Sequence, residues 1–290
     1  MLDNLLLHPK TKTAAHNFVV SKAGSLLIIG EPGSGKAALA EAVAASLLKL
    51  PPDGLSSYPY FHHLKIADSA QSISINQIRN VISFLKLKAT GMEAVKRVVL
   101  IENAHLMTEE AQNALLKILE EPNSDTLFIL TAASEESLLP TISSRTKVIT
   151  AYPVSLKAAR EYFEPASAPE IERQWQLSRG QAGLLSALLQ SQEHALSSSI
   201  EEAKKFIKLN DYGRLLMLRN LKGRADLLNL LRALNKLLAA LYQNAVKQKQ
   251  NSLAKKLLSD RKTVNSLTDS LSRNAAPRLA QIYLSLNLKV

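Results

Sequence analysis

The chain has 290 residues, a formal net charge of +11 and no cysteine. This length suffices for about two domains of ordinary size, and the lack of cysteine excludes disulfides, thiol catalysis and cysteine-ligated zinc. No apolar run approaches the roughly 20 residues that cross a membrane. Residues 1–8 lack the basic region of a secretory signal. We therefore expect a cytoplasmic protein.

The first predicted elements surround a glycine-rich loop. The apolar run 25–29 predicts a buried strand, and the Ala- and Leu-rich stretch 37–48 predicts a helix. The residues between them fit the phosphate loop G-x-x-x-x-G-K-[ST] at every position except the last, where Ala37 stands. The alternative is an ordinary Gly-Pro turn between strand and helix.

Each part of such a loop has its own task. Glycines allow backbone N–H groups to surround phosphate oxygens, and the lysine reaches the β- and γ-phosphates. The final hydroxyl binds the Mg²⁺ that hydrolysis needs, and Ala37 removes it. The candidate nucleotide-binding residues of this loop are Gly30, Gly33, Ser34, Gly35, Lys36 and Ala37.

Strands and helices continue to alternate through the first half. Residues 61–66, 97–101 and 127–131 predict strands, and residues 75–87 and 108–119 predict helices, with Thr108 as the N-cap of the second. This order predicts an α/β fold with a parallel sheet and helices on both faces. Ligands of such sheets lie at the carboxyl ends of strands, where Gly30, Glu102 and Thr131 fall.

From Tyr152 onward the pattern is helical. Three short helices are predicted at 157–162, 170–178 and 181–190. Longer Leu-rich helices follow at 200–209, 212–221, 225–248, 253–258 with its continuation, and 277–286. We expect an α/β domain at 1–151, a small helical domain at 152–198 and an all-helical domain at 199–290.

The positive charge belongs to the last third of the chain. Residues 1–200 hold 18 Lys and Arg against 19 Asp and Glu, whereas residues 201–290 hold 18 against 6, a net charge of +12. Such asymmetry points either to nucleic acid or an acidic partner, or to a solvated helical surface. Because few aromatic residues lie among these charges, a base-stacking surface is not expected.

A second candidate site follows the strand at 97–101. In P-loop ATPases this strand ends in Asp-Glu, of which the Asp orients Mg²⁺ and the Glu polarises the attacking water. Here Glu102 retains a carboxylate, but Asn103 cannot accept a proton at neutral pH and therefore cannot act as a general base. The alternative is a simple turn at the end of the strand.

Three long motifs occur in the order typical of one protein family. They are Glu102–Pro122 (ENAHLMTEEAQNALLKILEEP), Ser74–Arg79 (SINQIR) and Leu138–Arg145 (LLPTISSR). They resemble the AAA+ clamp-loader subunits of bacteria, and within that family the chain is most similar to the delta-prime subunits of DNA polymerase III. The resemblance is strong over roughly residues 20–150.

This resemblance implies an AAA+ P-loop module, a helical lid and an all-α collar. It also implies a hetero-oligomeric ring of five subunits, with gamma/tau and delta as partners, that uses ATP to open a sliding clamp and place it on primer-template DNA. Delta-prime subunits donate an arginine finger from a Ser-Arg-Cys motif to a neighbour's ATP site. Ser144-Arg145-Thr146 matches that motif, so Arg145 is the candidate catalytic residue in trans. The alternative is an Arg in an ordinary surface ion pair.

The departures from the family pattern agree with one another. Ala37 lacks the metal hydroxyl, Asn103 lacks the catalytic carboxylate, and Gly183 stands where active members carry Arg. The first sensor position, near Ala132 and Ala133, also lacks a polar side chain. ATP or ADP bound without hydrolysis is compatible with this pattern.

The segment 50–69 lacks the zinc module of the family and offers only His62 and His63, so no metal site is expected. Adjacent histidines on a strand point to opposite faces.

We therefore predict a catalytically silent subunit that acts through Arg145. The first alternative is an active gamma-like clamp-loader ATPase, which would hydrolyse ATP in the presence of Mg²⁺. A stand-alone P-loop kinase is the second alternative, and it gives no purpose to the basic helical third of the chain.

Overall fold

The computed structural model describes residues 1–22, 24–66, 72–86, 89–90, 93–120, 123–164, 166–190, 195–221, 223–273 and 275–290. These residues form two compact units. The first comprises Met1–Tyr162 with Gln181–Gly183, and the second comprises Phe163–Gly180 with Leu184–Val290. Glu121 and Pro122, which end the longest family motif, lie outside the described residues. The division into three domains stays a prediction.

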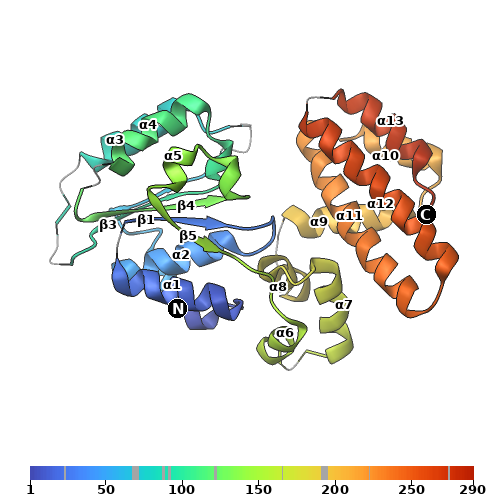
Figure 1. Ribbon diagram of the computed structural model, residues 1–290, viewed down its shortest axis with the longest axis horizontal. Helices are drawn as coiled ribbons and strands as arrows, with labels where there is room; N and C mark the ends of the chain where they lie inside the picture. The colour runs from blue at the N-terminus through green and yellow to red at the C-terminus, as the bar shows by residue number, and fades with distance from the viewer. Residues whose placement is uncertain are drawn as a thin grey trace. The chain divides into compact units, whose positions relative to one another are not determined.

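A parallel sheet organises the first unit (Figure 1). Its strands are β1 (Ser25–Ile29), β2 (Phe61–Leu64), β3 (Arg97–Ile101), β4 (Thr126–Ala132) and β5 (Thr146–Thr150), in the order β2-β3-β4-β1-β5. All neighbouring pairs are parallel. Every residue of β3 and β4 is buried, as expected for strands covered on both faces. The predicted α/β fold is confirmed, although the strand expected at 61–66 ends at Leu64.

Helices cover both faces of this sheet (Figure 1). Because successive residues of a strand point to opposite faces, Leu26 and Ile28 pack with one set of helices while Leu27 packs with the other. The first set is α1 (Pro9–Ser21) and α2 (Lys36–Leu48), and the second is α3 (Ile75–Leu85) and α4 (Glu109–Glu120). Two further helices are α5 (Pro140–Ser143) and α6 (Leu156–Tyr162), and short 3₁₀ turns occupy Leu2–Asn4, Pro52–Gly54, Ala104–Leu106 and Glu135–Ser137.

Strand β5 is an element that the sequence pattern does not predict. Its residues include Lys147, and only Ile149 is buried, so the apolar signal of a covered strand is weak. The strand forms instead by pairing along the whole of β1, from Ser25 opposite Thr146 to Ile29 opposite Thr150. A tertiary pairing therefore decides the structure of this edge.

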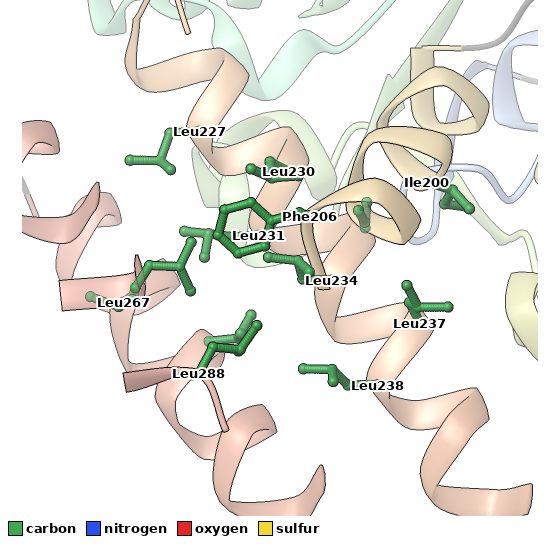
Figure 2. Packing of buried hydrophobic residues seen from close by; sticks show 14 of the residues in the cluster. Ile200, Phe206, Leu227, Leu230, Leu231, Leu234, Leu237, Leu238, Leu267 and Leu288 are labelled. Carbon is green, nitrogen blue, oxygen red and sulfur yellow. The ribbon is translucent and has the colours of Figure 1, made fainter. Parts of the chain in front are cut away.

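The second unit contains only helices among its described residues. They are α7 (Ala168–Ser178), most of α8 (Ala182–Gln190), α9 (Ala195–Ile207), α10 (Asp211–Arg219), α11 (Arg224–Lys247), α12 (Asn251–Ser272) and α13 (Pro277–Asn287). Leucines of α11 fill the core, and Figure 2 shows Phe206 of α9 lying among Leu230, Leu231 and Leu234. None of the helices described in either unit is long and apolar enough to cross a membrane.

One guanidinium is buried within this helical unit. Arg214 of α10 is 5 % exposed, and it donates hydrogen bonds to the carbonyl oxygens of Phe206, Ile207, Leu288 and Val290. Its Nη1 lies 2.7 Å from Leu288 O, and the guanidinium also stacks over the Phe206 ring. Arg214 thus connects the end of α9 to the segment that follows α13.

Candidate functional site

The glycine-rich loop has the strand–loop–helix setting that the sequence predicts. It leaves the carboxyl end of β1, and α2 begins at Lys36 with Gly35 as its N-cap. Gly33 and Gly35 have φ angles of +88° and +87°, a region that side-chain-bearing residues rarely adopt. The six predicted loop residues thus lie together between the end of β1 and the start of α2, at the carboxyl ends of the strands.

Lys36 is bound to its own loop. Its Nζ donates to Gly30 O at 2.5 Å and to Glu31 O at 3.1 Å. Burial lowers the pKa of Lys36 to about 8, and the nearby carboxylates of Glu102 and Glu31 oppose that shift. The amine is therefore still mostly protonated at pH 7, and backbone carbonyls of the loop satisfy it.

The backbone of residues 181–183 covers the same loop. A Cβ added to Gly183 would lie 2.9 Å from both Cα and N of Gly35 and 3.1 Å from Gly33 O. Gln181 Nε2 lies 3.3 Å from Glu31 Oε2, and the buried Ser34 Oγ has no hydrogen-bond partner among the described residues. Gly183, the position at which active family members carry Arg, is thus in contact with the loop but has no room for a side chain.

We expect Gly183→Ala to lower the free energy of unfolding by about 1–2 kcal/mol, because the added methyl collides with the Gly35 backbone. Alanine is the better helix former, so a loss must come from this contact rather than from helix propensity. Gly223→Ala is the control for steric collision, since its Cβ meets nothing within 4 Å and any loss there is that of alanine at the N-cap of α11. Urea unfolding measures both, and equal midpoints would show that residues 181–183 do not pack on the loop.

Glu102 lies at the end of β3, where two basic side chains of the neighbouring chain segment meet it. His63 Nε2 is 3.3 Å from Glu102 Oε2, and Lys65 Nζ is 3.6 Å from the same oxygen. The hydrogen bond from His63 holds the pKa of Glu102 below its usual value, and the charge of Lys65 adds to this effect against the cost of burial. Protein side chains therefore neutralise the carboxylate that would face a metal in an active P-loop ATPase.

Sequence reasoning missed this role of His63 and Lys65. The parallel register pairs Leu64 with Ile101, so Lys65 and Glu102 follow directly at the same edge. As expected for adjacent strand residues, His62 takes the other direction and packs against the Phe84 ring at 5.0 Å between centroids. The signal is a His and a Lys two residues apart at the end of the strand beside Glu102, and it becomes visible only when the strand register is known.

Asn103 is a turn residue in this structure. Its φ is +54°, which Asn tolerates better than most residues, and its backbone N–H donates to Thr131 Oγ1 at 2.9 Å. Thr131 is buried near the end of β4. Its hydroxyl lies one residue before Ala132, where the resemblance puts the first sensor position and where the side chain is apolar. These contacts hold the backbone of the β3 and β4 ends together.

Arg145 lies at the amino-terminal ends of the parallel strands, whereas the glycine-rich loop lies at their carboxyl ends. It precedes β5, whose first residue, Thr146, pairs with Ser25 at the start of β1, whereas the loop follows Ile29 at the other end. Five strand residues at about 3.3 Å each separate the two ends by roughly 15 Å. Arg145 Nη2 is 2.9 Å from Glu120 Oε1, and Nη1 donates to Thr141 O at 3.0 Å.

The site does not fit the Mg²⁺–nucleotide of an active P-loop ATPase. A metal hydroxyl is missing at Ala37, and Lys36 is bound to loop carbonyls. Gly183 contacts the turn whose N–H groups would surround phosphate, and Glu102 is paired with His63 and Lys65. The loop is therefore closed in the sense that its own carbonyl oxygens bind Lys36, while His63 and Lys65 bind Glu102.

The family model and the curated relatives that match this chain describe the same kind of protein. Residues 13–155 match the family described as "DNA polymerase III, delta subunit". DNA polymerase III subunit delta' of Pseudomonas aeruginosa is 35% identical over 137 residues, which is 42% of this chain and 41% of the relative. The subunit of the same name from Escherichia coli is 32% identical over 138 residues, 43% and 41% of the two chains. The matched segment therefore spans less than half the length of these relatives.

A solved structure of similar fold covers nearly the whole chain. The DNA polymerase III gamma subunit-related protein of Thermotoga maritima has a TM-score of 0.58 and 19% sequence identity, and the match covers 96% of this chain and 97% of that one. At this identity the likeness shows the fold alone. Residues 13–155, about half of the chain, are thus similar to the delta' subunits of DNA polymerase III.

Proposed function

We propose that this chain is a non-hydrolysing delta-prime subunit that supplies Arg145 to the ATP site of a neighbouring subunit. The observation that carries the proposal is the position of Arg145 at the amino-terminal ends of the strands, away from the glycine-rich loop of its own chain at their carboxyl ends. A guanidinium roughly 15 Å from the loop of its own chain cannot contact phosphates held there. Any phosphate that Arg145 contacts must therefore belong to another chain.

The local contacts of Arg145 are compatible with such a role. Its side chain is 35 % exposed, and its ion pair with Glu120 lies at the surface. An exposed pair of this kind contributes at most about 1 kcal/mol, so a γ-phosphate can replace the carboxylate as the partner. A planar guanidinium that is always charged suits the charge that develops on a transferring phosphoryl group.

The closed loop supports the absence of hydrolysis. Its lysine is occupied, its metal hydroxyl is missing, and its second carboxylate is replaced by Asn103. Each of these changes removes a separate requirement of phosphoryl transfer. In this proposal the loop of the chain is a structural element, with ATP or ADP at most bound and not turned over.

An exposed apolar stripe supports assembly with other subunits. One face of α13 packs into the core through Ala280 and Leu284, while another face remains exposed. Leu279 is 70 % exposed and Tyr283 is 52 % exposed, with Ile282 and Leu286 on the same stripe. A helix that is apolar on two faces needs a second partner, which we take to be gamma/tau or delta in a ring that loads a sliding clamp on primed DNA.

The experiment is an ATP turnover assay with Mg²⁺ on the purified chain. We expect no hydrolysis above that of the variant Lys36→Ala, because the loop lacks both the metal hydroxyl and the catalytic carboxylate. Addition of purified gamma/tau and delta should produce a complex that contains the chain and hydrolyses ATP. Turnover by the isolated chain that Lys36→Ala abolishes would identify it as an active ATPase instead.

A further inference from the structure

The hairpin of α11 and α12 carries an unusual charge distribution. Between Asp226 and Asp269 the sequence has eight Lys and Arg but a single acidic residue, Asp260. Asp260 is completely buried, and its Oδ1 accepts a hydrogen bond from the backbone N–H of Lys289 at 3.0 Å. Within the part of this hairpin that the structure describes, the surface therefore carries no carboxylate between these two ends.

The exposed lysines form a stripe on α12. Lys255 and Lys262 are seven residues apart, so they lie on the same side of the helix, about 10 Å from each other, and Lys256 adjoins them. All three are exposed, and none has an ion pair within the described residues. The opposite side of α12 is buried in the helical core through Leu257 and Val264.

This arrangement differs from that of an ordinary solvated helix. Surface helices commonly alternate acids and bases at spacings of three or four residues, which stabilises them, whereas like charges repel. Elsewhere in the same unit such pairs are present, as between Lys204 and Glu201 at 2.6 Å. The stripe on α12 has no such pair among the described residues, so its like charges repel one another, and an anion from outside would lower this repulsion.

Neutral donors accompany the lysines. Ser259 lies between Lys255 and Lys262 on the same stripe, and exposed amide and hydroxyl side chains occupy the preceding corner at Gln248, Gln250, Asn251 and Ser252. Lysines together with amide and hydroxyl groups are the side chains that contact phosphates of nucleic acids. The hairpin's one aromatic residue, Tyr242, packs against the core, so stacking on bases has no support.

We propose that this stripe of Lys255, Lys256 and Lys262 binds the phosphate backbone of DNA without reading its sequence. The inference is carried by the charges and exposure of α12 and does not depend on the arginine-finger role of Arg145. Duplex DNA offers one negative charge per about 1.7 Å of its axis, so three lysines along a helix contact phosphates in several registers. The binding is therefore expected to weaken steeply with salt.

The test uses the isolated full-length chain and a fluorescent 30-base-pair duplex at 50–200 mM salt. The wild type should bind with an association constant that falls linearly with salt on logarithmic axes. The variant Lys255→Gln/Lys256→Gln/Lys262→Gln should bind more weakly, with a slope shallower by about 2.7, since each lost phosphate contact removes about 0.9. Thermal unfolding confirms that the variant retains the fold.

The control is Lys204→Gln/Lys205→Gln on α9 together with Lys208→Gln in the turn that follows it, which removes the same charge from another part of the unit. The slope of the control variant should differ from that of the wild type by no more than about 0.9, the contribution of one phosphate contact. The proposal is overturned if the wild type does not bind DNA at 50 mM salt, or if both triple variants lose affinity equally. Binding to phosphatidylserine vesicles or to polyglutamate in preference to DNA would also overturn it, and would assign the stripe to a membrane or an acidic protein.

Discussion

Arg145→Ala is expected to lower ATP hydrolysis at the neighbouring site of the reconstituted complex by about 10³-fold or more, the scale of an arginine finger. The bulk rate of a complex with several ATP sites will fall by less, so single-turnover measurements at limiting ATP are the better readout. The isolated chain should keep its unfolding temperature, because the Arg145 side chain is partly exposed and its ion pair lies at the surface.

Glu120→Gln separates a finger from an ordinary surface ion pair. This change removes the charged partner of Arg145, whose Nη2 lies 2.9 Å from Glu120 Oε1, while leaving the guanidinium in place. If Arg145 acts on a phosphate, Glu120→Gln leaves hydrolysis nearly unchanged. If the two substitutions reduce the rate by the same factor, the ion pair is what matters, and the finger assignment is wrong. Arg145→Lys should restore little, because an ammonium lacks the planar fork.

Arg214→Ala is expected to reduce the free energy of unfolding of the helical unit by about 3–5 kcal/mol, because a large buried side chain and several hydrogen bonds are lost together. The substitution leaves the carbonyl oxygens of Phe206, Ile207 and Leu288 without their charged donor in a buried setting. It also opens a cavity beside the Phe206 ring, over which the guanidinium stacks. Urea denaturation followed by circular dichroism at 222 nm measures the change.

Arg219→Ala is the matched control for this substitution. It lies on the same helix, α10, but its side chain is exposed, so the expected change is below about 0.5 kcal/mol. A loss of less than about 1 kcal/mol for Arg214→Ala would mean that water satisfies the freed carbonyls, contrary to the buried network described here.

Much of the α/β unit follows from local patterns. The apolar runs at 25–29 and 97–101 coincide with β1 and β3, because strands covered on both faces need uninterrupted apolar residues. The helix predicted from Thr108 begins at Glu109, as its capping and acidic first turn indicate. In contrast, β5 escaped prediction, because only one of its residues is buried and its structure comes from pairing with β1.

The sequence by itself determined which chemical groups are missing. Ala37 has no hydroxyl and Asn103 has no carboxylate in any fold, so these two losses can be read from residue identity alone. The same holds for the positive charge of the last third and for the absence of acids between Asp226 and Asp269, apart from Asp260.

Tertiary structure alone decided what takes the place of those groups. Pairing of β2 with β3 brings Lys65 beside Glu102. Pairing of β1 with β5 places Arg145 at the strand ends away from the glycine-rich loop. Gly183 contacts Gly35, although 148 positions separate them in the sequence. Each contact joins residues that are distant in sequence. Its existence depends on strand register and packing, which no local pattern of hydrophobicity or charge specifies.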